Sequence, residues 1–240
     1  METVNLSRNK RPLYVQIKNI IKDRILHGQY PLDTNIPPEP RLEEEFGVSK
    51  ITVRGAIKEL VQEGYLEPSS GRGTRVIRNT KAAKRSTWKS FTELLVEEGH
   101  AMQKKLLATA AVSYEPETEQ HRLFGDAGLR VERLYLLDGA PYIHYAHYLP
   151  AMLENADLSG LAEHSLYGFL EENGIVLARF RDAFAVSAAP AGVAEQLNLA
   201  VGTPLLKRLR YAYDEAGGVV EYSEGYYNTA LQHYVVNYDG

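Results

Sequence analysis

Three basic side chains recur at helical spacing in the stretch KITVRGAIKEL, and together they suit a polyanion. Lys50, Arg54 and Lys58 are four residues apart, which brings side chains onto one face of a helix. Cations arranged in this way neutralise the phosphates of duplex DNA, and such binding weakens with salt. An ordinary solvated helix face has the same spacing, so the interpretation depends on the neighbouring elements.

Other reactive side chains give weaker signals. The chain has no cysteine, which excludes disulfides, thiolate zinc sites and cysteine nucleophiles. His144 and His147 suggest a metal site, but side chains three residues apart on a strand point to opposite faces and do not easily share an ion. No nucleotide-binding loop or nucleophile motif is present, so we predict no cofactor, no metal and no catalytic residue.

Charge is unevenly distributed over the 240 residues, whose formal net charge is −4. Residues 1–85 contain 16 lysines and arginines against 10 acidic residues, whereas the remainder contains 11 against 21. This division predicts two domains, the first with a polyanionic partner. No apolar run is long enough to span a bilayer and no signal-peptide pattern opens the chain, so we expect a cytoplasmic protein without a membrane partner.

The elements around the basic residues have the order of a winged helix. Apolar periodicity predicts a helix over PLYVQIKNIIKDRIL, then a short helix over RLEEEF that ends at Gly47. A third helix follows, with the Ser49 hydroxyl as its N-terminal cap and Gly64 at its end. Two short helices joined by GVS have the proportions of a helix-turn-helix.

A short β-hairpin is predicted after the third helix. Tyr65–Glu67 and Thr74–Ile77 are its strands, and they flank a Gly/Ser turn that bears Arg72. Glycines in such a turn let the backbone approach a phosphate or the minor groove. The hairpin therefore completes the predicted wing.

The stretch FGVSKITVRGAIKELVQEGYLEPSSGRGTRV closely resembles the winged-helix domain of GntR-type bacterial transcription regulators, over about Pro12 to Arg78. The resemblance implies a homodimer that binds a palindromic operator. It implies DNA contacts from Arg41, Ser49, Lys50, Thr52, Arg54, Lys58, Gly71, Arg72, Gly73 and Thr74.

Two departures from this family bear on the operator. The family usually reads Ser-Glu-Arg-Glu before the second helix, whereas here PEPR puts Pro40 at the arginine and Arg41 one place later. Lys50 stands where the family often has arginine, and lysine lacks the fork that reads guanine bidentately. We therefore expect an operator that differs from the common family sequence.

The rest of the chain is predicted to be an α+β domain around an antiparallel sheet. SFTELLVEEGH begins a helix, and LRVERLYLLDGAPYIHYAHYLP contains two strands joined at Asp138-Gly139. A helix over SLYGFLEENGI, a strand over FRDAFAVSAAP, a helix over AGVAEQLNL and a second hairpin follow. The predicted boundaries are 1–78 for the DNA-binding domain, 79–89 for a linker and 90–240 for the second domain.

The segments SFTE, RVERLYLLDGAPYIHYAHYLP, SLYGFL and GTPLL, in this order, resemble the UTRA effector domain of the HutC branch of GntR regulators. The fold of that domain is similar to chorismate lyase. The resemblance implies a small effector that alters DNA affinity and also implies dimerisation. It implies effector contacts from Ser90, Phe91, Thr92, Arg133, Tyr135, Tyr145, Ser165, Tyr167, Arg179, Glu221 and Tyr227.

The implied effector residues depart from those of sugar-phosphate sensors. Tyr135 replaces a second arginine on the strand face of Arg133, and Tyr145 replaces a glutamate. Loss of one arginine removes a bidentate phosphate clamp. We therefore expect a neutral or singly anionic polyol, sugar derivative or aromatic acid. The alternative is that the tyrosines are ordinary sheet and core residues.

These patterns predict a DNA-binding transcription regulator, and the family analogy favours a repressor. Two alternatives remain open. One is a lyase-like enzyme with Arg133 and Glu221 as binder and acid/base, and the other is an architectural DNA-binding dimer. An added metabolite separates the three, because a regulator changes its operator affinity, an enzyme consumes the compound and an architectural dimer ignores it.

Overall fold

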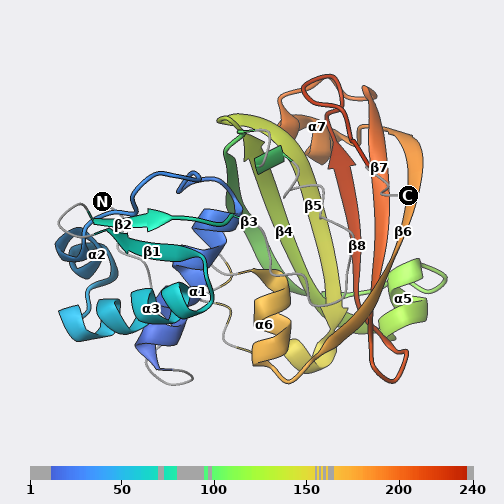
Figure 1. Ribbon diagram of the computed structural model, residues 1–240. Coiled ribbons are helices and arrows are strands. Elements are labelled where there is room, and N and C mark those ends of the chain that lie inside the picture. The colour runs from blue at the N-terminus through green and yellow to red at the C-terminus, as the bar shows by residue number, and fades with distance from the viewer. Residues whose placement is uncertain are drawn as a thin grey trace, which may run out of the picture. The chain divides into compact units, whose positions relative to one another are not determined.

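The protein is represented by a computed structural model that describes residues 12–69, 73–79, 95–96, 99–154, 156, 158, 161 and 165–236 (Figure 1). The chain divides into two compact units. Unit 1 comprises Met1–Gln103 and Val235–Gly240, and unit 2 comprises Lys104–Tyr234. The boundaries at 78 and 90 stay predictions, because most residues between them lie outside the described ranges. Within those ranges, no helix is long and apolar enough to cross a bilayer.

Unit 1 contains the three predicted helices. They are α1 (Leu13–Leu26), α2 (Glu39–Phe46) and α3 (Lys50–Gln62). Gly47 ends α2 with φ at +61°, in the left-handed region that glycine adopts without a steric penalty. One core joins the apolar faces of the helices to the wing, and it includes Ile17, Ile20, Ile21, Leu42, Phe46, Val53, Leu60, Leu66 and Val76.

Ser49 precedes α3 with an extended backbone, as an N-cap residue does. The prediction that its hydroxyl caps the helix is wrong, since the side chain makes no cap hydrogen bond. Ser49 Oγ lies instead 2.9 Å from Thr52 Oγ1. A second hydroxyl three residues along the chain competes with the backbone N–H for the serine, and the sequence reasoning did not consider it.

The wing is a two-stranded antiparallel sheet of β1 (Leu66–Ser69) and β2 (Gly73–Val76). Leu66 pairs with Val76. Each end of the two strands lies within two residues of its predicted position. The tip, 70–72, lies outside the described residues, so Gly71 and Arg72 are not placed. Helix, helix-turn-helix and hairpin confirm the predicted winged helix.

Unit 2 is built on a six-stranded antiparallel sheet with the order β3-β4-β5-β8-β7-β6. The strands are β3 (Met102–Ser113), β4 (Ala127–Leu137), β5 (Ala140–Pro150), β6 (Leu177–Ala188), β7 (Pro204–Asp214) and β8 (Val219–Tyr227). The predicted α+β class is confirmed. Strand β3 was missed, because MQKKLLATAAVS contains few of the β-branched and aromatic residues that mark strands.

A tight turn joins β4 to β5 at the predicted dipeptide. Asp138 and Gly139 have φ of +49° and +87°, and a two-residue hairpin turn of this kind requires positive φ at both positions. The turn fixes which residues of the two strands face each other, and it pairs Arg133 with Tyr145.

Different helices pack on the two faces of the sheet. The face of Arg133 and Tyr145, called here the inner face, is covered by α6 (Leu166–Glu172) and the short helix η1 (Ala151–Leu153). The outer face contacts α5 (Glu119–Phe124) and α7 (Ala191–Leu197). In Figure 1, α7 lies at one end of the sheet, and α5 and α6 lie at the other.

Candidate functional site

The three predicted cations lie on the exposed face of α3. The side chains of Lys50 and Arg54 are 53% and 60% exposed, and Lys58 is also exposed. The spacing in the sequence therefore produces a solvent-facing basic stripe, of the kind that neutralises DNA phosphates.

A carboxylate at the start of α2 orients this stripe. The single N–H of Arg54 Nε donates a bifurcated hydrogen bond to the two carboxylate oxygens of Glu39, at 3.1 and 2.9 Å, and Glu39 also lies 3.9 Å from Lys50 Nζ. This interaction uses only Nε, so the terminal nitrogens of Arg54 can still donate to a base or a phosphate. The sequence reasoning missed Glu39, although its position between Pro38 and Pro40 at the head of the helix-turn-helix is a usable signal.

The other predicted DNA contacts are placed less uniformly. Arg41 is exposed on α2, and the hydroxyls of Ser49 and Thr52 pair at the start of α3. Gly73 has φ at +97° and opens β2, where Thr74 follows half-buried. These placements keep the predicted residues on the helix-turn-helix and the wing, and their role in DNA contact stays a prediction.

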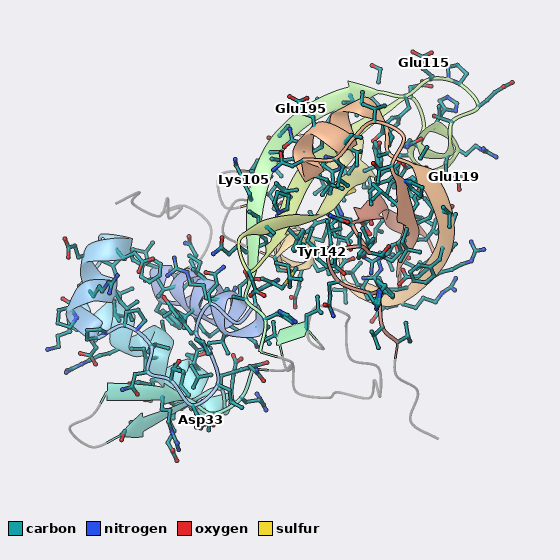
Figure 2. All side chains as sticks on the ribbon, turned by 90° about the horizontal axis from the view of Figure 1, so that it is seen from above. Asp33, Lys105, Glu115, Glu119, Tyr142 and Glu195 are labelled. Atoms are coloured by element: carbon teal, nitrogen blue, oxygen red, sulfur yellow. The ribbon has the colours of Figure 1, made fainter. Side chains whose placement is uncertain are left out.

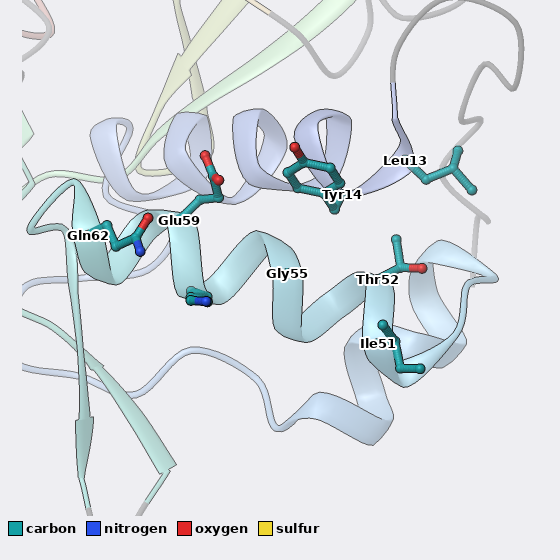
Figure 3. A pocket seen from close by; sticks show the side chains of 8 residues that line it. Leu13, Tyr14, Ile51, Thr52, Gly55, Glu59 and Gln62 are labelled. Atoms are coloured by element: carbon teal, nitrogen blue, oxygen red, sulfur yellow. The ribbon is translucent and has the colours of Figure 1, made fainter.

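A shallow groove of about 600 Å³ runs between α1 and α3 (Figure 3). Gly55 contributes to it, because this position has no side chain and a Cβ would already lie 3.4 Å from Tyr14 Cβ. The groove is lined by Leu13, Tyr14, Ile51, Thr52, Gly55, Lys58, Glu59 and Gln62. It therefore borders the basic stripe.

A second group of polar residues gathers inside the curved sheet of unit 2, where side chains are crowded together (Figure 2). We call it the inner-face cluster, and it consists of Arg133, Tyr145, His147, Asp182, Arg208, Arg210, Glu221, Ser223 and Tyr227. Five different strands contribute to it. Charged side chains are seldom so deeply buried unless they are paired or bind something.

Four of the predicted effector residues belong to this cluster. Arg133 and Glu221 are 1% and 0% exposed, and Tyr145 and Tyr227 are also buried. Arg133 Nη2 donates to the carbonyl of Leu161 at 2.7 Å. Tyr135, two residues from Arg133 on the same strand face, packs edge-on against Tyr145 with ring centroids 5.4 Å apart.

His147 joins Glu221 at the centre of the cluster. His147 Nδ1 lies 2.8 Å from Glu221 Oε1. Because a carboxylate only accepts, Nδ1 carries the proton and Nε2 is left as an acceptor. Burial lowers the pKa of His147 against the opposing pull of Glu221, which keeps the ring neutral. Its ring also stacks on Tyr145 at 5.2 Å.

Arg208 binds the tyrosine pair. Its Nη2 donates to the hydroxyl of Tyr145 at 2.6 Å, and that hydroxyl also contacts the hydroxyl of Tyr227. The ring of Tyr145 rests on β8 at Gly225, where a Cβ would overlap ring atom Cε1 and approach Cδ1 to 2.9 Å. The Tyr145 ring can occupy this position only because residue 225 has no side chain.

Arg210 forms a bidentate pair with Asp182, at 2.7 Å for each bond. Burial acts to raise the pKa of Asp182, but the hydrogen bond from Arg210 and both neighbouring arginines outweigh it, so the net shift is downward. The hydroxyl of Tyr167, on α6, lies 3.5 Å from Arg210 Nη1. The sequence reasoning missed Arg208 and Arg210, although their i,i+2 spacing in a strand predicts a shared face.

Several buried atoms of the cluster have no hydrogen-bonding partner among the described residues. They are His147 Nε2, Arg208 Nε, Glu221 Oε2 and Ser223 Oγ. Two of them accept, one donates, and the serine hydroxyl does either. Buried polar atoms are seldom left unpaired, so these four atoms can bond to a polar group that none of the described residues supplies.

Other predicted effector residues lie apart from the cluster. Arg179 is exposed on β6 and stacks over the ring of Tyr213, on the outer side of the sheet. Ser165 is half-buried at the start of α6 and makes no side-chain cap bond. Ser90, Phe91 and Thr92 lie outside the described residues. His144 points away from His147, as predicted, and lies 4.0 Å from Glu132.

Comparison with known proteins matches both units. The family described as bacterial regulatory proteins, GntR family, matches 13–76, and the UTRA domain family matches 97–231. The chain is 27% identical over 219 residues to the HTH-type transcriptional repressor NagR of Bacillus subtilis, with 90% of each chain covered.

Two further similarities span nearly the whole chain. The mannosyl-D-glycerate transport/metabolism system repressor MngR of Escherichia coli is 27% identical, with coverage of 91% of this chain and 92% of the relative. The crystal structure of the possible transcriptional regulator YydK from Bacillus subtilis aligns with a TM-score of 0.52 at 21% identity, over 95% of this chain and 99% of the other. The fold, the two family matches and these relatives confirm the resemblance: the chain belongs to the GntR family of transcription regulators, in the group with a UTRA domain, and not to a family of enzymes.

Proposed function

We propose that this regulator is a homodimeric repressor that binds a palindromic operator in the cytoplasm and responds to a small effector at the inner-face cluster. The basic stripe on α3 supports the DNA-binding part of the proposal. The set of buried atoms without partners supports the effector part, and it is the observation that carries the proposal. The effector is a sugar derivative or polyol that is neutral or carries one negative charge.

The charge balance of the cluster favours such an effector. Arg210 and Asp182 neutralise each other through their bidentate pair. Neutral His147 adds no charge. Counted by formal charge, the cluster contains three arginines against the two carboxylates of Asp182 and Glu221, and this excess of one favours a ligand with at most one anionic group. A second negative charge would be buried without a partner, at a cost of several kcal/mol.

The unpaired atoms favour hydroxyl groups on the same ligand. A sugar hydroxyl donates to His147 Nε2 or Glu221 Oε2 and accepts from Arg208 Nε. The name of the relative MngR refers to mannosyl-D-glycerate, a glycoside with one carboxylate, and this supports the same ligand class here.

We propose that the effector acts by a population shift. A ligand that binds one arrangement of the dimer more tightly changes how often the two winged helices match the spacing of the operator half-sites. The inducer then lowers operator affinity, as for a repressor released by its ligand. Coupling of this kind is typically ~1–3 kcal/mol, or about 5- to 150-fold.

Calorimetry with full-length protein tests the proposal. Three probes of similar size are compared: a glycoside of glycerate, its neutral glycerol counterpart and a hexose 6-phosphate. We expect the monoanion or the neutral probe to bind at least about tenfold more tightly than the phosphate. The binding probe also weakens operator binding in a gel-shift titration.

Two outcomes would refute parts of this proposal. Tighter binding of the hexose phosphate would overturn the charge argument. Operator binding that ignores every metabolite in a thermal-shift screen would favour an architectural dimer. In that screen, a true ligand at about 100 times its Kd stabilises the protein by ~2.7 kcal/mol, which is readily detected as a higher melting temperature.

A further inference from the structure

Ile51 is the most exposed large apolar side chain in the described part of the chain, at 83%. It lies in the first turn of α3 and points away from α1 (Figure 3). It takes no part in the core of unit 1. A β-branched residue is also a poorer helix former than alanine. Neither packing nor helix formation therefore accounts for an isoleucine here.

The position lies within the basic stripe. Arg54 and Lys58 follow Ile51 at i+3 and i+7, so they share its side of the helix. Gly55 follows at i+4 and offers no side chain, so the groove along α3 passes directly beside Ile51. The apolar side chain of Ile51 therefore lies beside the groove and close to the cations Arg54 and Lys58.

Duplex DNA has a matching feature. In the major groove, thymine presents a 5-methyl group, which apolar side chains contact, while the phosphates along the rim supply the charge that the cations neutralise. We infer that Ile51 reads a thymine methyl and makes the operator thymine-dependent at one position in each half-site. The inference rests on the proposed operator binding and goes further, since it names the side chain and the base.

Methyl deletion tests the inference directly. Full-length protein first selects its operator from random duplexes, and each thymine is then replaced singly by deoxyuridine, which removes only the methyl. At the contacted position, wild-type affinity should fall about fourfold, as expected for one buried methyl. Ile51→Ala should bind the intact operator more weakly by a similar factor and should not respond to the replacement.

Two further variants sharpen the test. Leu32→Ala changes another exposed apolar residue of unit 1, 45% exposed in the connector before α2, and should keep the wild-type response. Ile51→Gln should shift the selected base from thymine towards adenine, which glutamine reads bidentately. Ile51→Ala should melt at the wild-type temperature, because an exposed position contributes little to stability.

The outcomes separate this inference from the proposed function. If selection yields an operator but wild type tolerates deoxyuridine at every thymine, the role of Ile51 is overturned and operator binding stands. Retained methyl sensitivity in Ile51→Ala overturns it equally. If selection enriches no sequence, operator binding itself fails, and the inference fails with it.

Discussion

The position of Tyr145 over Gly225 leads to a quantitative prediction about a single methyl group. Gly225→Ala places a Cβ where it overlaps Cε1 of the Tyr145 ring and lies 2.9 Å from Cδ1. The ring must then move, which breaks the hydrogen bond from Arg208 Nη2 at 2.6 Å and the contact with Tyr227. Overpacking costs ~1–3 kcal/mol and a buried unpaired donor ~1–3 kcal/mol. Since the two overlap in origin, we expect a loss of about 2–4 kcal/mol in unfolding free energy.

The assay is a double-mutant cycle measured by urea unfolding of the full chain. In the Tyr145→Ala background there is no ring to displace, so adding Gly225→Ala should be neutral or should stabilise by ~0.5 kcal/mol, because glycine within a strand costs conformational entropy. In the wild-type background the melting temperature should fall by about 10 °C. Equal costs of Gly225→Ala in the two backgrounds would refute the steric explanation.

Four other perturbations test the two sites. Glu39→Gln should lower the preference for operator over scrambled DNA by up to about fivefold, because Arg54 loses the carboxylate that orients it and the loss of a negative charge favours binding to any phosphate backbone. Gel-shift titrations of both duplexes measure the ratio of the two affinities, and an unchanged ratio would contradict the prediction. Lys58→Ala removes one phosphate contact from each protomer of the proposed dimer, so the slope of log K against log salt should fall by about 2, and an unaltered slope would exclude a phosphate contact. In the folded state the pKa of His147 lies below its ordinary value of 6.5. The unfolded chain therefore binds the proton more readily, and the unfolding free energy should fall as pH drops below 6.5. Urea unfolding at pH 7.5 and pH 5.5 should show a smaller fall for His147→Gln than for wild type, although a second buried histidine, His144, contributes in the same direction. Glu221→Gln should shift effector preference towards a doubly anionic ligand in calorimetry, since it leaves a further positive charge uncompensated, and an unchanged order of the three probes would contradict the charge argument.

Local patterns predicted the winged helix well, because its elements are short and follow one another along the chain. The left-handed Gly47 and the Asp138-Gly139 turn show why: each is set by a steric rule that acts within a few residues. Strand β3 was missed because its sequence has little β-propensity. Its extended conformation depends on pairing with the neighbouring strand β4, which the local sequence does not reveal.

The composition of the inner-face cluster was predictable only in part, and its role in effector binding stays a prediction. The resemblance pointed to Arg133, Tyr145, Glu221 and Tyr227, and the structure brings these four together. Arg208 joins them through pairing of β7 with β8, a long-range fact that no local pattern contains. Arg179 illustrates the opposite case, since its position along β6 turns it to the other side of the sheet.

The strand order has a consequence for how the protein is made. β8 is the last strand in the sequence, yet it lies between β5 and β7. During synthesis, β3-β4-β5 and β6-β7 therefore remain two separate pieces until Tyr227 has left the ribosome, whereas the wing is complete at Val76. A nascent or prematurely terminated chain would carry the winged helix without a complete six-stranded sheet, so only the finished polypeptide contains both folded units.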